Sequence, residues 1–238
     1  TQVENQGLSS AFIQQDHLHE TGKVFVTLDE GGSAQYEMAE DAAWDFIEAN
    51  AVAIKTVRDA EAFVFGSLAA RAASKTALQS FLKVSKFSVF DLNLRPPFYD
   101  METLNELMQA ADMLKFNDDE LYDIATQMGS PFNSLNQHME FIAKKTKTQI
   151  ICVTLGMHGA VLLHFGTWYF NSGYKIKVMD TVGAGDSFLA TLVLGLVEGD
   201  DIQSTLNNAC GMRALVAASQ GANPTITKSD LKIFVHPD

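Results

Sequence analysis

Apolar residues along most of the chain follow two patterns, short continuous runs and longer stretches in which they recur at helical spacing. The short runs predict buried strands, and the helical spacing predicts amphipathic helices. Strands are predicted at 60–68, 87–94, 113–117, 149–156, 160–165 and 175–179. Helices are predicted at 101–114, 118–129, 133–146, near 185–198 and near 201–219. This alternation is typical of an α/β fold with a mainly parallel sheet and helices on both faces.

The first forty residues are patterned differently. The stretch KVFVTLDEGGSAQYEM contains two β-patterned segments on either side of a DEGG turn. It predicts a hairpin with one solvated face, which resembles a flap or lid. We therefore assign 23–39 to a β-hairpin lid, and 1–22 together with 40–238 to one α/β core.

Composition narrows the class of protein. With 17 basic and 29 acidic residues, the formal net charge of −12 disfavours nucleic acid and acidic membrane surfaces as partners. Cys152 and Cys210 lie in apolar surroundings and form no CxxC pair or disulfide framework, so we interpret them as buried core residues. No apolar run approaches the ~20 residues needed to cross a bilayer. These features predict a soluble cytoplasmic protein.

The segment DTVGAGDSF, residues 180–188, is the strongest candidate for chemistry. A turn of small residues at 183–185 leads into an apolar helix, where unpaired N–H groups and the helix dipole favour an anion. Asp186 lies in the first turn of that helix, and it is either a catalytic carboxylate or a simple cap or dipole partner. A dinucleotide-binding loop is a further alternative, although Phe188 stands where the third glycine of that fingerprint belongs.

Besides the 180–188 segment, polar or glycine-rich loops follow three other predicted strands, and each of these loops has a plain structural explanation as a turn, cap or solvated acid. Ligands of such sheets bind beyond the carboxyl ends of the strands. The 180–188 segment and the three other loops, all at one edge, therefore predict a ligand site there. The candidates from the three further loops are Asn93 and Arg95, Asn117 and Glu120, and Thr154, Gly156 and Gly159.

Together these segments resemble a known family. DTVGAGDSF closely resembles the signature of the ribokinase-like (PfkB) carbohydrate kinases, while NDDE, TLGMHG and QGANPT are similar to further motifs of that family. The resemblance covers nearly the whole chain in the family's order and implies a ribokinase-like fold. The stretch FDLNLRPPFYD looks most like the fructokinase branch, and a related stretch occurs in 2-keto-3-deoxygluconate kinases.

The resemblance implies an ATP-dependent sugar kinase, most simply a fructokinase. Asp186 would accept the proton of the sugar hydroxyl, while N–H groups of Gly183, Ala184 and Gly185 stabilise the transferred phosphoryl group. Asn93 and Arg95 would face the sugar or the phosphate. A 2-keto-3-deoxygluconate kinase, another sugar or nucleoside kinase, and a non-catalytic sugar or nucleotide sensor remain alternatives, with a nicotinamide-dependent oxidoreductase as an alternative from another class.

The resemblance also implies cofactor positions. Asn117 and Glu120 would organise Mg²⁺, Glu120 through water. Thr154, Gly156, Gly159 and Asn208 would contact ATP. Asp180, the Val182 carbonyl and Gly221 would form a K⁺ site, and the lid would pair two subunits in a homodimer.

One part of the family pattern is absent. Members begin with a strand that carries a sugar-contacting acid and then a GGxxxN segment, whereas here the one Gly-Gly pair, Gly31-Gly32, falls in the hairpin turn. The opening residues instead look like the family's middle, where a helix end and a strand lead into the lid. The sequence is then a part of a longer polypeptide, a natural truncation, or a chain completed by another.

Overall fold

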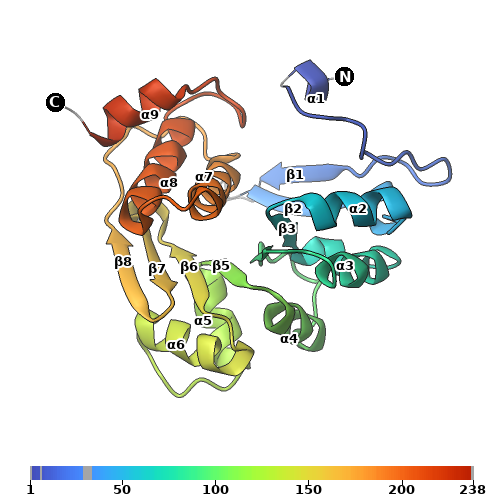
Figure 1. Ribbon diagram of the computed structural model, residues 1–238, viewed down its shortest axis with the longest axis horizontal. Helices are drawn as coiled ribbons and strands as arrows, with labels where there is room; N and C mark the ends of the chain where they lie inside the picture. The colour runs from blue at the N-terminus through green and yellow to red at the C-terminus, as the bar shows by residue number, and fades with distance from the viewer. Residues whose placement is uncertain (1, 6, 29–33, 237–238) are drawn as a thin grey trace.

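A six-stranded sheet runs through the centre of the computed structural model, which describes residues 2–5, 7–28 and 34–236 (Figure 1). Its strands lie in the order β3-β4-β5-β6-β7-β8. The first four pair in parallel, and β7 and β8 are antiparallel to their neighbours. The strands are β3 (Phe63–Gly66), β4 (Ser88–Asp91), β5 (Met113–Asn117), β6 (Ile150–Thr154), β7 (Ala160–His164) and β8 (Thr167–Asn171). The predicted mainly parallel α/β sheet is confirmed, with an antiparallel hairpin at one edge.

The strand predicted at 175–179 is wrong, because β8 already occupies the edge of the sheet beside β7. The backbone N–H groups of Met179 and Asp180 both donate to the carbonyl of Ala217, at 2.8 and 3.3 Å. The segment therefore crosses the end of a helix instead of joining the ladder, although its alternating apolar residues resemble a strand.

Helices cover both faces of the sheet (Figure 1). Most begin at a side-chain cap that accepts a backbone N–H, which fixes where the chain turns into helix. Such caps are Asn50, Asp100, Asn117, Ser134, Asp201 and Thr227. The α-helices are α1 (Gln2–Asn5), α2 (Ala51–Asp59), α3 (Ser74–Leu82), α4 (Met101–Ala110), α5 (Asp118–Gln127), α6 (Leu135–Thr146), α7 (Ala184–Glu198), α8 (Ile202–Ala217) and α9 (Lys228–Val235), and short 3₁₀ turns cover Ala43–Asp45, Ser67–Ala70 and Gly156–His158.

Alternate residues of each strand enter two separate hydrophobic clusters. Phe90 and Leu114 pack with helices α3 to α6 on one face, whereas Val89, Met113 and Cys152 pack with α7 and α8 on the other. Since parallel neighbours in register point the same way, each residue's face can be followed across the sheet. The face that α7 covers carries the candidate chemistry described below.

The predicted hairpin is present as β1 (Val24–Leu28) paired antiparallel with β2 (Ala34–Met38), and its DEGG turn lies outside the described residues. The strand expected in the opening residues before the lid is wrong: among the described residues of 1–22 no strand forms. Side-chain contacts hold that segment instead, since the Gln14 amide exchanges two hydrogen bonds with the backbone of Glu48, at 2.7 and 2.8 Å. Across the described ranges, no helix is both long and apolar enough to span a membrane.

Candidate active site

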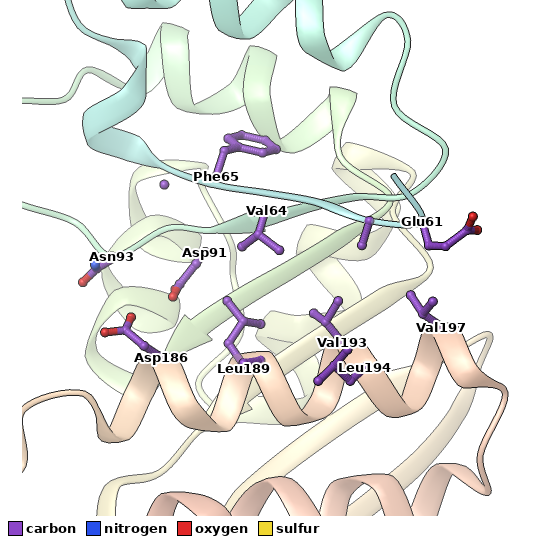
Figure 2. Close-up of a pocket in the computed structure, with 13 residues that line it drawn as sticks. Glu61, Val64, Phe65, Asp91, Asn93, Asp186, Leu189, Val193, Leu194 and Val197 are labelled. Atoms are coloured by element: carbon purple, nitrogen blue, oxygen red, sulfur yellow. The ribbon is translucent and has the colours of Figure 1, made fainter. Parts of the chain in front are cut away.

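A cavity of about 670 Å³ lies between strand β3 and helix α7. Its polar end is formed by Asp91, Asn93 and Asp186, which point toward one another in Figure 2. The rest of its wall is largely apolar, with Val64 on β3 facing Leu189 and Val193 on α7. Three polar side chains, from the end of strand β4, the loop after it and helix α7, thus meet at one end of an apolar groove.

Asp186 is not the cap of its helix. Helix α7 begins at Ala184, its N-cap is Gly183, and no side chain accepts a capping hydrogen bond there. The carboxylate of Asp186 makes no hydrogen bond or ion pair within the part of the chain that the structure describes. The capping interpretation therefore has no support in the structure, and the carboxylate is free to meet a ligand.

Two glycines beside Asp186 have different reasons to be glycine. Gly183 has a left-handed φ of 77°, and a Cβ there would lie 2.4 Å from the carbonyl oxygen of Ala222. This close approach ties the 180–183 turn to the GANP segment. At Gly185 a Cβ would meet no atom within 4 Å, so within the described residues packing does not require glycine there.

The loop after β4 is shaped by Asn93, which adopts a left-handed φ of 40° that asparagine tolerates better than most residues. This conformation places Asn93 in the cavity wall. Arg95 is not among the residues that line the cavity, and its Nη1 donates to the carbonyl of Leu94 at 2.9 Å. The structure thus brings Asn93, but not Arg95, to Asp186.

Asn117 and Glu120 form a capping box at the start of α5. The Asn117 side chain accepts the N–H of Glu120, and Glu120 Oε2 accepts the N–H of Asn117, both at 2.8 Å. Glu120 Oε1 also accepts the N–H of Leu94 at 2.8 Å. Glu120 is buried, not the solvated acid of the plain interpretation, and it fastens the loop after β4 to the loop after β5.

This arrangement does not fit a direct role for Glu120 as a magnesium ligand, because both of its oxygens already hold backbone N–H groups. Among the described residues there is also no group of three or more His, Cys, Asp or Glu side chains arranged to hold a metal ion. The geometry supports Glu120 as a brace for the site.

The TLGMHG loop joins β6 to β7, so it is a hairpin connection as well as a candidate nucleotide loop. The Thr154 hydroxyl donates to the Phe116 carbonyl at 3.4 Å, and Arg213 Nη1 of α8 donates to the Gly156 carbonyl at 2.9 Å. A Cβ at Gly159, where φ is 83°, would lie 1.9 Å from the Asn171 carbonyl oxygen. Gly159 is therefore required by packing in the folded chain.

Asn208 does not join that loop. It lines a separate pocket between α7, α8 and α9, with Thr205 and Met212 among its neighbours. The face of α8 decides this, since Arg213 reaches Gly156 while Asn208, five residues earlier, lies on another side of the helix. The adjacent Asn207 turns to β8, where its Oδ1 accepts from Asn171 at 2.8 Å.

Asp180 begins the turn that leads to Asp186, and its Oδ1 accepts the N–H of Val182 at 3.0 Å. The contact of Gly183 with Ala222 brings this turn against the loop that contains Gly221. The three residues predicted for a monovalent cation therefore lie on two loops that touch.

An ion pair that the sequence analysis did not identify lies at the same edge. Lys115 Nζ is 3.0 Å from Asp91 Oδ1, and both side chains are buried. The two residues are register partners on β4 and β5, so they point to the same face of the sheet. The sequence did contain a signal for this pair, since each of two buried strands carries one charged residue.

Comparison with known proteins gives consistent matches. A model of the pfkB family of carbohydrate kinases matches residues 1–229. The chain is 27% identical over 242 residues to a protein described as a sugar kinase from Pyrococcus horikoshii, covering 97% of this chain and 73% of that protein. Fructokinase-2 of Solanum lycopersicum is 24% identical over 245 residues, covering 94% of this chain and 72% of that protein.

The fold also matches solved structures. A double-mutant fructokinase from Vibrio cholerae O395, in a fructose, ADP and potassium ion bound form, gives a TM-score of 0.84. The match covers 99% of this chain and 79% of that chain at 22% sequence identity. A likeness at this identity establishes a shared fold.

Proposed function

The chain belongs to the PfkB family of carbohydrate kinases, and we propose that its protein phosphorylates a hydroxyl of fructose with ATP. The observation that carries this proposal is the free carboxylate of Asp186, at the glycine-led start of α7 and at the polar end of a cavity. Support for fructose comes from the names of relatives such as Fructokinase-2 of Solanum lycopersicum.

In the proposed reaction the sugar hydroxyl lies beside Asp186. As its oxygen bonds to the γ-phosphorus of ATP, the bond from that phosphorus to the bridging oxygen breaks and ADP leaves. The hydroxyl proton passes to the Asp186 carboxylate. The backbone N–H groups of Gly183 and Gly185 and the positive end of the α7 dipole stabilise the charge on the transferred group. The N–H of Ala184 is not available for this role, because it donates to the carbonyl of Thr181 at 3.3 Å.

In this proposal ATP binds to the loops at the carboxyl edge of the sheet. Thr154, Gly156 and Gly159 would contact ATP, and Asn117 would lie near its phosphates. Asp180 with the carbonyls of Val182 and Gly221 would hold K⁺ on the two touching loops. Mg²⁺ would neutralise charge on ATP, and Glu120 would interact with it only through water, because both of its oxygens already accept backbone N–H groups.

The hairpin β1–β2 is the proposed lid over the sugar and the proposed contact between two subunits. Its strands pair only with each other among the described residues. Val24 and Phe25 expose 44% and 54% of their surface, and exposed apolar side chains of this kind favour an interface.

The proposed activity is tested by an ATP-consumption assay of the full-length protein against fructose, ribose, 2-keto-3-deoxygluconate and adenosine. We expect fructose-dependent ADP formation together with a phosphorylated sugar identified by mass spectrometry. A strong signal with 2-keto-3-deoxygluconate alone would replace the proposed substrate and keep the reaction. ATP or sugar binding without turnover would instead favour a sensor.

A matched pair of glycine substitutions tests the anion-binding turn. In Gly185→Ala we expect a melting temperature at or above that of the wild type, because the new methyl group meets no atom and alanine favours helix. Turnover should nevertheless fall by on the order of 100-fold, because the methyl group displaces the phosphoryl group from its position.

The control is Gly183→Ala, which should lose both stability and turnover. Its left-handed backbone and the 2.4 Å approach to Ala222 predict a loss of about 1–3 kcal/mol in the free energy of unfolding. Wild-type kinetics in Gly185→Ala would contradict a phosphate bound at this turn.

A further inference from the structure

The Asp91–Lys115 ion pair stands in an unusual place for a purely structural contact. It lies where β4 ends and two residues before β5 ends, on the face covered by α7, and Asp91 forms part of the cavity wall beside Asp186. Burying two opposite charges gains little stability on balance, because both lose their hydration. Packing and stability alone therefore do not explain why these two charges are buried at this position.

The two oxygens of the Asp91 carboxylate have different surroundings. Oδ1 is closed off from solvent and lies 3.0 Å from Lys115 Nζ. Oδ2 accepts no hydrogen bond from any described residue, so it is the oxygen that a ligand in the cavity would meet. Burial raises the pKa of Asp91, the ammonium of Lys115 opposes the rise, and the carboxylates of Glu120 and Asp186 add to it. A buried carboxylate in these surroundings is stabilised by any ligand that donates a hydrogen bond.

The surroundings also indicate what kind of ligand would donate. Figure 2 shows Asp91 directed at the cavity between Asn93 and Asp186. A ligand with two hydroxyl groups on neighbouring carbons places one donor beside each carboxylate. An anionic group between Asp91 and Asp186 would be repelled by both carboxylates, so the space between these two side chains favours a polyhydroxylated, uncharged group, while the phosphate is held at the 183–185 turn.

We propose that Asp91 is a substrate-binding residue, which accepts a hydrogen bond from a sugar hydroxyl next to the one that faces Asp186, and that Lys115 is the positioning residue that holds its carboxylate in the cavity wall. The inference rests on the proposed function for the identity of the ligand. The geometry of the pair itself is independent of which sugar binds.

The test compares the wild-type full-length protein with the double variant Asp91→Leu/Lys115→Met. Removing both charges together leaves no lone buried ion, so the variant should fold with a melting temperature near that of the wild type. We expect its Kd for fructose by calorimetry and its KM for fructose to rise about 10- to 100-fold, because a hydroxyl loses its charged acceptor. The KM for ATP should stay unchanged.

A second measurement uses the single variant Asp91→Asn and a series of monodeoxy fructose analogues. The wild type should discriminate most strongly against the analogue that lacks the hydroxyl bound by Asp91, and both variants should lose that discrimination alone. If the Asp91–Lys115 pair were purely structural, the variants would bind all the analogues more weakly by the same factor.

The outcomes separate this inference from the proposed function. An unchanged Kd and KM for fructose in a folded double variant would overturn the role of Asp91, while turnover would still support the kinase. Fructose binding by the wild type without phosphorylation would contradict the kinase proposal, and the comparison of Kd values would still decide the role of Asp91. Absence of both binding and turnover with fructose would overturn the inference as stated.

Discussion

Replacing Asp186 by asparagine should lower kcat for sugar phosphorylation by about 10²–10⁴-fold. Asparagine keeps the size of the side chain but cannot accept the hydroxyl proton as a carboxylate does. The side chain is exposed at the start of α7 and makes no hydrogen bond or ion pair to the described chain, so the substitution removes no contact that stabilises the fold. The Kd for ATP should therefore stay within error of the wild-type value, and the melting temperature should fall only by the small amount that the loss of one helix-dipole interaction causes.

The matched control is Glu102→Gln, which removes an exposed acid from the first turn of α4. If loss of a favourable dipole interaction caused the lower kcat of Asp186→Asn, both variants would show it, since each loses one negative charge at a helix N-terminus. We expect Glu102→Gln to keep wild-type kcat. Full turnover in Asp186→Asn would rule out Asp186 as the base, and loss of ATP binding would indicate a role in the nucleotide site instead.

Local patterns predicted the part of the site that is local in sequence. A turn of small residues followed by an apolar helix places Gly183 and Asp186 together whatever the tertiary structure does, and the structure keeps that arrangement. The edge on which the loops gather followed from parallel pairing of the strands, which is also observed.

Contacts that depend on register or helical phase could not be predicted in the same way. Asp91 and Lys115 meet because two strands 24 residues apart align with those residues as partners. Asn208 falls on the wrong side of α8 for the TLGMHG loop, because a motif fixes a residue's position in the sequence but not its face. Arg95 reaches back to its own neighbour Leu94, which no spacing rule anticipates.

The two missed helices on either side of β3 have different causes. Helix α2 has apolar residues at helical spacing and a local cap in Asn50, which were signals that the sequence analysis did not use. Helix α3 has no side-chain cap, and its start depends on tertiary contacts. Ser74, for example, donates its hydroxyl to the Trp44 carbonyl and accepts the N–H of Ile47, at 2.9 and 2.8 Å. Such long-range side-chain contacts carry no local sequence signal.

The largest loss of stability from one substitution is expected at Arg71. Its Nη2 lies 2.8 Å from Asp45 Oδ1, with 12% and 5% of the two side chains exposed, and its guanidinium packs 4.8 Å from the ring centre of Phe98. The same Nη2 reaches the carbonyl of Ala39 at the end of the hairpin, at 3.5 Å. One side chain thus joins the proposed lid, the segment before α2 and the loop after β4.

We expect Arg71→Ala to lower the free energy of unfolding by about 3–5 kcal/mol in urea denaturation, because Asp45 is left as a buried charge without a partner. Arg71→Lys should recover only part of this loss, since an ammonium cannot bridge Asp45 and stack on Phe98 with one planar group. The control is Lys86→Ala, which breaks the exposed pair of Lys86 with Glu61 and should cost about 0–1 kcal/mol. Equal losses in Arg71→Ala and Lys86→Ala would show that burial of the Arg71 pair contributes nothing to the fold.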